Sequence, residues 1–270
     1  MTQYGQFCPV AKAAEIFAER WTPLILRELL MGSHRFGELE RGLPRISRSL
    51  LTQRLRFLEG SGVVERRTVA GSRSPEYHLT EAGRDLYEVI VRLGEWSHRW
   101  FNPLLDDDAL DPQLLVWDMH RALRRERLPN RRVVVQLDFV GAAQGSYWLI
   151  LEPSGSSVCW DPPGFEVDLF VRTDTLGMHR VWLGHQTFAD ALVTGQIELD
   201  GPRGLVRGFP EWFALSQFAT VRRAYDAVPA ATAEPTARSP QGRPGAVALN
   251  GTAAPPPART APSRRAPARP

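Results

Sequence analysis

A stripe of polar side chains without a carboxylate runs through residues 48–56. Its members recur at intervals of three and four residues, so they share one face of a helix: Arg48, Ser49, Thr52, Gln53 and Arg56. Arginine bonds guanine at two atoms, glutamine bonds adenine in the same way, and hydroxyl groups bond bases or phosphates. The pattern therefore predicts a helix that reads the major groove of double-stranded DNA. The alternative is an ordinary solvated helix face.

The residues around this stripe predict the elements that hold it. Ser47 is expected to cap the helix and to join the DNA contact. The inward face at helical spacing consists of Ile46, Leu50, Leu51, Leu55 and Leu58. A short helix over residues 35–42 precedes it, and two earlier helices begin near Pro9 and Thr22. Arg54 lies off the stripe and is expected to contact phosphate or to pack locally.

A hairpin and a long helix are predicted next. Residues 62–79 alternate as two strands around a turn, which would form a wing with Arg73 near its tip as a further DNA contact. The helix over residues 80–101 has an apolar stripe wide enough to bind a second copy of the chain. Together these elements make residues 1–101 a winged helix-turn-helix DNA-binding domain.

The same stretch resembles the HxlR family of winged-helix transcriptional regulators. The matching residues include Cys8-Pro9-Val10, Arg20-Trp21-Thr22, Phe36-Gly37-Glu38-Leu39, the run from Ile46 to Leu55, and Tyr77 with Leu79-Thr80. The resemblance implies a homodimer assembled through the first helix and the helix over residues 80–101. It also implies a pseudo-palindromic operator, because two-fold protein symmetry requires a two-fold site. Repression is the more direct outcome, since a dimer bound over a promoter blocks it without further contacts.

Cys8 stands where the first helix begins. A thiol at a helix N-terminus is more reactive, and some members of the family sense oxidants or electrophiles with a cysteine at this place. The other interpretation is a small buried apolar group at the dimer contact. A Cys8→Ser variant whose DNA affinity responds to diamide as that of the native chain does would exclude the sensor.

The second half predicts an α+β domain over residues 113–228. Strands in a mostly antiparallel sheet are expected at residues 131–140, 146–152, 156–160, 166–172 and 195–201. Helices are expected at residues 112–127, 174–183 and 187–193 and at the end of 202–218. From Val133 to Phe218 the chain resembles the sterol carrier protein type-2 fold, chiefly in residues 167–174 and 191–201.

That resemblance implies an apolar tunnel for a lipid-like molecule between the sheet and the helices. The candidates to line it are Leu176, Val181, Trp182, Phe188, Leu192, Phe209, Trp212 and Phe213. The alternative is a filled core without a cavity.

Composition separates the domains and limits the location. Residues 102–112 hold two prolines and an acidic cluster and are expected to form a linker. Residues 229–270 are rich in alanine, proline and arginine and are expected to be disordered. The net charge of +3 owes much to this tail, which holds six arginines and one acidic residue.

No apolar run approaches the roughly 18 residues of a membrane helix, and no signal-peptide pattern is present. We therefore expect a cytoplasmic protein with two free cysteines.

Two functions fit these features. No nucleophile elbow, metal cluster, phosphate loop or carboxylate pair is convincing, so we expect no enzyme, cofactor or metal. The first hypothesis is a regulator that binds operator DNA as a homodimer and whose C-terminal domain senses an apolar ligand. The alternative is a lipid or sterol carrier that uses the winged helix for dimerisation or protein docking. Replacing Arg48 and Gln53 together would abolish specific DNA binding only under the first hypothesis.

Overall fold

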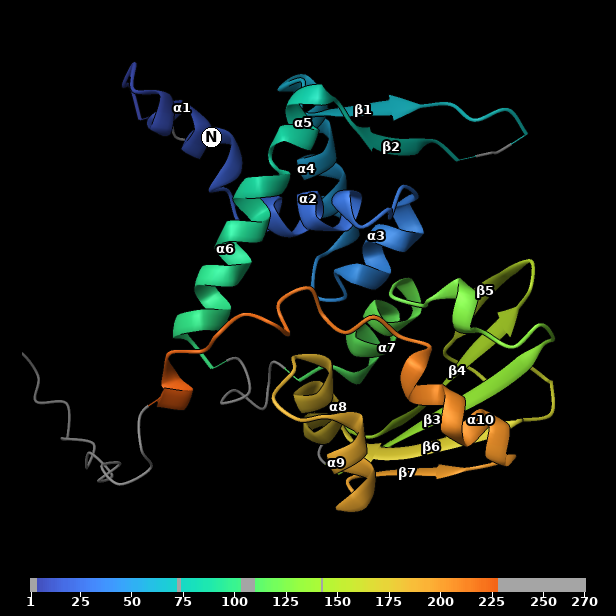
Figure 1. The fold of residues 1–270 in the computed structure, drawn as a ribbon. Coiled ribbons are helices and arrows are strands. Elements are labelled where there is room, and N and C mark those ends of the chain that lie inside the picture. The colour runs from blue at the N-terminus through green and yellow to red at the C-terminus, as the bar shows by residue number, and fades with distance from the viewer. Residues whose placement is uncertain (1–3, 72–73, 103–109, 142, 228–270) are drawn as a thin grey trace, which may run out of the picture. The chain divides into compact units, whose positions relative to one another are not determined.

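The computed structural model describes residues 4–71, 74–102, 110–141 and 143–227 (Figure 1). Residues 1–228 form one unit that contains two hydrophobic cores, one drawn from residues 25–90 and the other from residues 115–213. Arg73, most of the expected linker and the tail from residue 229 lie outside the described residues. The predictions made for them, and for the domain boundaries, stay predictions.

The first core belongs to a winged helix-turn-helix. Its elements are α1 (Pro9–Phe17), α2 (Thr22–Leu30), α3 (Phe36–Gly42), α4 (Arg48–Gly60), β1 (Val64–Arg67), β2 (Glu76–Leu79), α5 (Glu81–Asp85) and α6 (Tyr87–Trp100). The strands pair in antiparallel fashion, with Val64 opposite Leu79 and Arg67 opposite Glu76, and form the wing. The single helix predicted over residues 80–101 is divided at Leu86, where α5 ends and α6 begins.

Local sequence explains where the helices begin. Pro9 and Pro23 occupy the first turns of α1 and α2, where the missing amide hydrogen has no intrahelical partner to lose. The Ser47 hydroxyl accepts a hydrogen bond from Leu50 N at 3.3 Å, which confirms the predicted cap of α4. The buried residues of α4 are Leu51, Leu55 and Leu58. Because this face packs inward, the polar stripe on the other side faces solvent.

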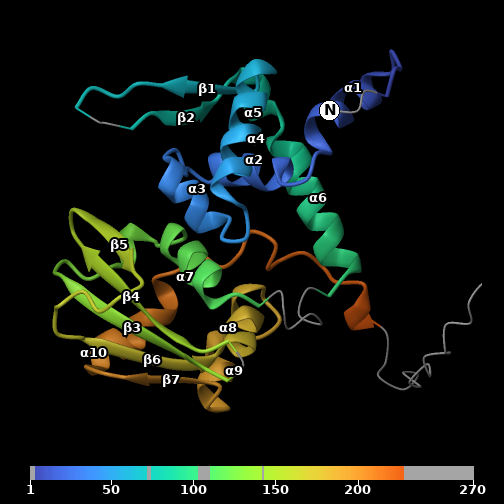
Figure 2. The same cartoon turned by 180° about the vertical axis from the view of Figure 1, so that it is seen from behind.

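The second core lies against a five-stranded sheet. Its strands are β3 (Val133–Val140), β4 (Gly145–Glu152), β5 (Gly155–Cys159), β6 (Leu169–Asp174) and β7 (Ile197–Asp200), in the order β5-β4-β3-β6-β7. The central pair β3 and β6 is parallel, and the other three pairs are antiparallel. Residues of β6 alternate strictly between buried and exposed, so one face of this strand packs on the core and the other faces solvent. Neighbouring residues of β3 and β4, such as Val134 and Ile150, are buried on the opposite face as well. Figure 2 shows the strands from behind.

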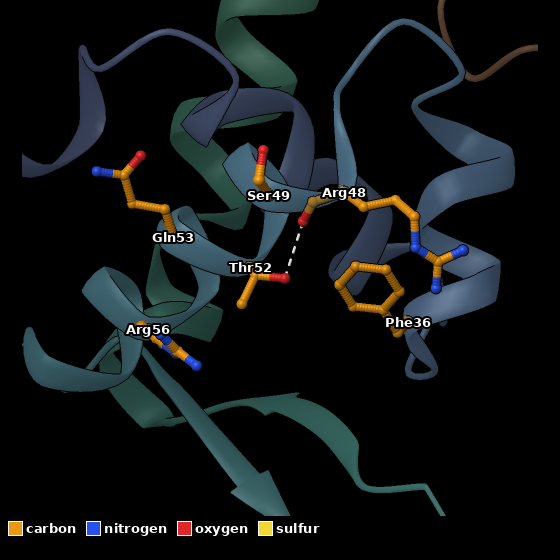
Figure 3. Close-up of a pocket in the computed structure, with 6 residues that line it drawn as sticks. All are labelled: Phe36, Arg48, Ser49, Thr52, Gln53 and Arg56. Carbon is orange, nitrogen blue, oxygen red and sulfur yellow. Dashed lines mark hydrogen bonds between the residues drawn. The ribbon is translucent and has the colours of Figure 1, made fainter.

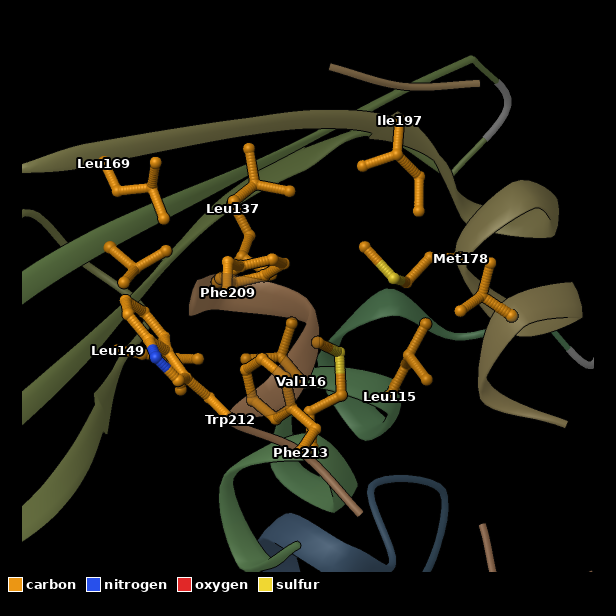
Figure 4. Close-up of a cluster of buried hydrophobic side chains, with 14 of the residues drawn as sticks. Leu115, Val116, Leu137, Leu149, Leu169, Met178, Ile197, Phe209, Trp212 and Phe213 are labelled. Carbon is orange, nitrogen blue, oxygen red and sulfur yellow. The ribbon is translucent and has the colours of Figure 1, made fainter. Parts of the chain in front are cut away.

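Helices α7 (Pro112–Arg121), α8 (Thr175–Trp182), α9 (Phe188–Val193) and α10 (Arg203–Gly208) accompany this sheet. Strand residues such as Leu137 and Leu149 face helix and turn residues such as Met178 and Phe209 across the core (Figure 4). These elements confirm the α+β class and the mostly antiparallel sheet.

Two helix predictions in this half were wrong. The helix expected over residues 112–127 ends at Arg121, and a 3₁₀ turn follows at Arg125–Arg127. In residues 202–218 the helix lies at the start, not at the end. The reason is a pairing between the two segments: Arg124 N donates to Trp212 O at 2.7 Å and Ala214 N donates to Ala122 O at 2.8 Å. Backbone groups that bond in this extended pairing cannot bond within a helix.

A buried ion cluster joins the two cores. The Glu28 side chain of α2 is 0 % exposed and lies 2.6 Å from Arg121 Nη1 and 2.7 Å from Arg27 Nη2. Arg121 also bonds Asp118. A Cβ atom at Gly42 would lie 1.8 Å from Glu28 Oε2, so only glycine leaves room for this carboxylate. Because Arg121 belongs to α7, the cluster connects the C-terminal half to α2.

Candidate nucleic-acid interface

The predicted stripe lies on the solvent side of α4, on an open concavity of about 610 Å³ (Figure 3). The lining residues are Phe36, Arg48, Ser49, Thr52, Gln53 and Arg56. Ser49, Gln53 and Arg56 are exposed, and Thr52 is half-buried. The structure thus brings all five stripe residues together on one surface, while their contact with DNA stays a prediction.

Arg48 is held at the α3 side of this concavity. Its guanidinium carbon lies 5.2 Å from the centroid of the Phe36 ring, and its Nη1 lies 3.2 Å from Glu40 Oε2. Figure 3 shows the side chain extending toward Phe36 and away from Gln53. A cation that is placed over a ring and beside a carboxylate is oriented and partly neutralised. Phe36 and Glu40 are therefore parts of the surface that the sequence argument missed.

The hydroxyl groups of the stripe are partly occupied within the protein. Thr52 Oγ1 donates to Arg48 O at 2.8 Å, so this hydroxyl keeps only acceptor capacity. The hydroxyls of Ser47 and Ser49 lie 3.2 Å apart, and Ser47 also caps the helix. The groups with the largest remaining hydrogen-bonding capacity are the Gln53 amide and the Arg56 guanidinium. They are three residues apart and so stand on adjacent turns of one face.

Arg54 is not brought together with the stripe. Its side chain is 14 % exposed, and its Nη2 lies 2.7 Å from Glu19 Oε2. The guanidinium therefore ties α4 to the segment between α1 and α2, which is the local-packing role that the sequence left open. We remove Arg54 from the candidate DNA contacts. Arg73, the candidate at the wing tip, lies outside the described residues.

Strand β2 of the wing is fastened to the two residues that precede α3. Tyr77 N donates to His34 O at 2.8 Å, and Arg35 Nε lies 3.3 Å from Glu76 Oε1. Hydrogen bonds from His78 and then from Arg35 hold the pKa of Glu76 below its ordinary value. The carboxylate stays ionised near neutral pH, so the ion pair with Arg35 persists and fixes the hairpin relative to the helix-turn-helix.

Cys8 is the residue that precedes α1, as the sequence predicted. It is half-exposed and is a free thiol, as is Cys159. Its proposed response to oxidants stays a prediction.

The residues expected to line an apolar tunnel lie in the second core. Those buried in it are Val181, Trp182, Phe209, Trp212 and Phe213, while Phe188 and Leu192 pack against it and Leu176 is half-buried. The Phe209 ring makes edge-on contacts with the rings of Phe188, Trp212 and Phe213, at centroid distances of 6.0, 5.7 and 5.1 Å. Figure 4 shows Phe209, Trp212 and Phe213 in this packing. Such packing favours a filled core around these residues.

Within the described ranges, no three His, Cys, Asp or Glu side chains come together in a way that could hold a metal ion. The helices of the same ranges include none with the length and apolar character needed to cross a bilayer.

Known proteins match the first part of the chain. The HxlR-like helix-turn-helix family matches residues 16–104. Over 101 residues the chain is 38% identical to the uncharacterized HTH-type transcriptional regulator YvaP of Bacillus subtilis, covering 94% of that protein and 37% of this chain. Over 94 residues it is 48% identical to the uncharacterized HTH-type transcriptional regulator Rv3095 of Mycobacterium tuberculosis, covering 58% of that protein and 34% of this chain.

A solved structure is also similar in sequence to this part of the chain. The reduced form of the transcriptional regulator YodB from B. subtilis is 33% identical, with 34% of this chain and 92% of that chain covered and a TM-score of 0.31.

Proposed function

Because the chain belongs to the HxlR-like helix-turn-helix family, we propose that it is a transcriptional regulator that binds operator DNA through the exposed face of α4. One observation supports this use of α4 above the others. Gln53 and Arg56 stand on adjacent turns of an open concavity, on a face that carries no carboxylate from residue 48 to residue 56. Ser47, Arg48, Ser49 and Thr52 would add contacts to bases and phosphates, and Arg73 would add one from the wing. A regulator bound over a promoter blocks transcription, so we propose that it is a repressor.

Binding to a duplex from the upstream region of its own gene tests the proposal. We expect binding that survives competition by random DNA and that weakens steeply as salt rises, because each neutralised phosphate releases counterions. Fluorescence anisotropy across a salt series measures both properties. Deleting residues 229–270 is the control for a contribution of the arginine-rich tail. Absence of binding even at low salt would contradict the proposal and would favour the carrier function.

We further propose that the regulator is a homodimer on a pseudo-palindromic site. In one chain α1 buries no residue, and α6 exposes Val89, Leu93, Trp96 and Trp100. These four positions are spaced by three and four residues and form one apolar stripe. Exposed apolar area of this kind is typical of a protein–protein contact. A second copy is the partner that the family implies, and its α6 would offer an identical stripe.

Replacing Leu93 and Trp96 together with glutamate is expected to produce monomers. Charges placed within an apolar contact lose hydration without gaining partners. Sedimentation should show dimers for the native chain and monomers for the variant. Operator affinity should fall about 100-fold or more, because the two half-sites are then bound independently.

Val193→Glu is the matched control for the dimer, since Val193 is 88 % exposed and lies on α9. It should leave the dimer intact. A native chain that sediments as a monomer at micromolar concentration would contradict the dimer.

The C-terminal half is proposed to sense an apolar ligand, and its likeness to the sterol carrier fold is part of the same proposal. Helices packed on one face of a mostly antiparallel sheet support that likeness. The filled packing around Phe209, however, argues against a ligand at the site expected from the sequence.

A further inference from the structure

A cavity of about 600 Å³ lies between helices that contribute to the two cores. Its walls come from α2 and α6 on one side and from α7 and α8 on the other, and residues 215–218 close part of it. Most of its lining is apolar and includes Met31, Tyr87, Leu114, Trp182, Leu215 and Phe218. Of the eight residues predicted to line a tunnel, Trp182 alone contributes to this lining. The volume is in the range of sites that hold small organic molecules.

The segment over residues 215–224 contacts helices on both sides of the cavity, α8 on one side and α6 on the other. Ser216 N donates to Trp182 O at 3.1 Å, which fastens the segment to α8. The Phe218 ring lies against α6, where a Cβ atom at Gly94 would come within 2.2 Å of its Cζ. The same short segment therefore contacts both walls, and a molecule inside the cavity would touch elements of both halves.

The charges beside the cavity already have partners. Arg27 pairs with Glu28, and Asp118 pairs with Arg121. A charged ligand would have to compete with these ion pairs or remain unpaired in an apolar site, and both are unfavourable. The lining therefore selects an uncharged molecule.

One polar group of the lining, the imidazole of His179, can orient such a molecule through a hydrogen bond. His179 Nδ1 lies 2.8 Å from Thr175 O, so this nitrogen carries the proton and donates to the carbonyl. Burial lowers the pKa of His179, so the ring is neutral near pH 7. Its Nε2 then has a lone pair that can accept a hydrogen bond. A hydroxyl or N–H group on the ligand is the matching donor.

We propose that this cavity is the effector site: it binds a neutral, mainly apolar molecule that carries one hydrogen-bond donor for His179. The proposal deepens the ligand-sensing part of the proposed function and rests on it. Because α2 and α6 belong to the DNA-binding half and α7 and α8 to the other, a bound molecule stabilises one arrangement of the two. Operator affinity then changes if the arrangements differ in affinity for DNA.

Fluorescence titration of the full chain with N-phenyl-1-naphthylamine tests the site. This probe is uncharged, aromatic and carries one N–H group. We expect saturable binding by the native chain and at least tenfold weaker binding by Leu114→Trp, in which the indole fills the cavity. Leu215→Trp fills the cavity from another wall, and it should weaken probe binding as Leu114→Trp does. Val193→Trp adds the same ring on the exposed surface of α9 and should bind as the native chain does.

His179→Phe keeps a ring and removes the acceptor, so binding should weaken by about threefold to tenfold. Saturating probe should change operator affinity by about fivefold or more. The proposal would be overturned by the absence of saturable binding, by binding of the probe to both filling variants as tightly as to the native chain, or by unchanged operator affinity. Operator binding measured without the probe reports separately on the DNA-binding function.

Discussion

Replacing Gln53 and Arg56 together with alanine is expected to lower operator affinity by about 30-fold or more. Each bidentate contact of glutamine or arginine with a base contributes about 1–3 kcal/mol of discrimination, so two such contacts contribute at least about 2 kcal/mol. Both side chains are exposed on the concavity of α4. Arg48 is left out of this pair because Phe36 and Glu40 already hold its guanidinium.

Anisotropy titrations with an operator duplex and a random duplex of equal length measure this effect. The affinity for the random duplex should fall only by the loss of one positive charge, and the salt slope should change by about 1. Gln144→Ala with Arg127→Ala is the matched control, because both side chains are exposed in the C-terminal half. Equal losses on both duplexes would show that α4 touches only the DNA backbone.

Helical periodicity predicted the members of the α4 surface but not what surrounds them. Spacings of three and four residues place Arg48, Thr52 and Arg56 on one face whatever the rest of the chain does. The partners of Arg54 and Arg48 come from other elements, since Glu19 precedes α2 and Glu40 belongs to α3. Such contacts depend on tertiary packing, which no local pattern specifies.

In the C-terminal half, too, local sequence patterns predict the elements but not the contacts between them. Alternation predicted each strand of the sheet, but it does not specify neighbours, so the parallel pairing of β3 with β6 was not anticipated. Apolar spacing also cannot separate a residue that lines a cavity from one that fills a core. Phe209 fits both patterns in the sequence, and the structure packs it among other rings.

Replacing Arg121 with methionine is expected to lower the free energy of unfolding by about 3 kcal/mol. Methionine keeps most of the length of the side chain and removes the charge. Glu28, which is 0 % exposed, would keep only Arg27 as a cationic partner, and Asp118 would lose its ion pair. A buried carboxylate that loses its partner typically costs about 3–5 kcal/mol, and the remaining contact with Arg27 places this case at the lower end.

Urea unfolding followed by tryptophan fluorescence measures the loss. Arg127→Met is the matched control, because Arg127 is 58 % exposed and its partner Glu211 is 64 % exposed. A surface pair of this kind contributes at most about 1 kcal/mol. Equal effects of the two substitutions would show that the cluster around Glu28 does not stabilise the junction between the two cores.

The deficit of Arg121→Met should grow with pH. Burial raises the pKa of Asp118 above its ordinary value, and Arg121 opposes that rise. Removing Arg121 therefore raises the pKa of Asp118 further. A carboxyl group with a raised pKa binds more protons in the folded chain than in the unfolded chain, so the free energy of unfolding falls as pH rises from the unfolded pKa to the folded one. We expect the difference between variant and native chain to be smaller at about pH 5 than at about pH 7. A difference that is larger at the lower pH would mean that Asp118 is not the group left unpaired.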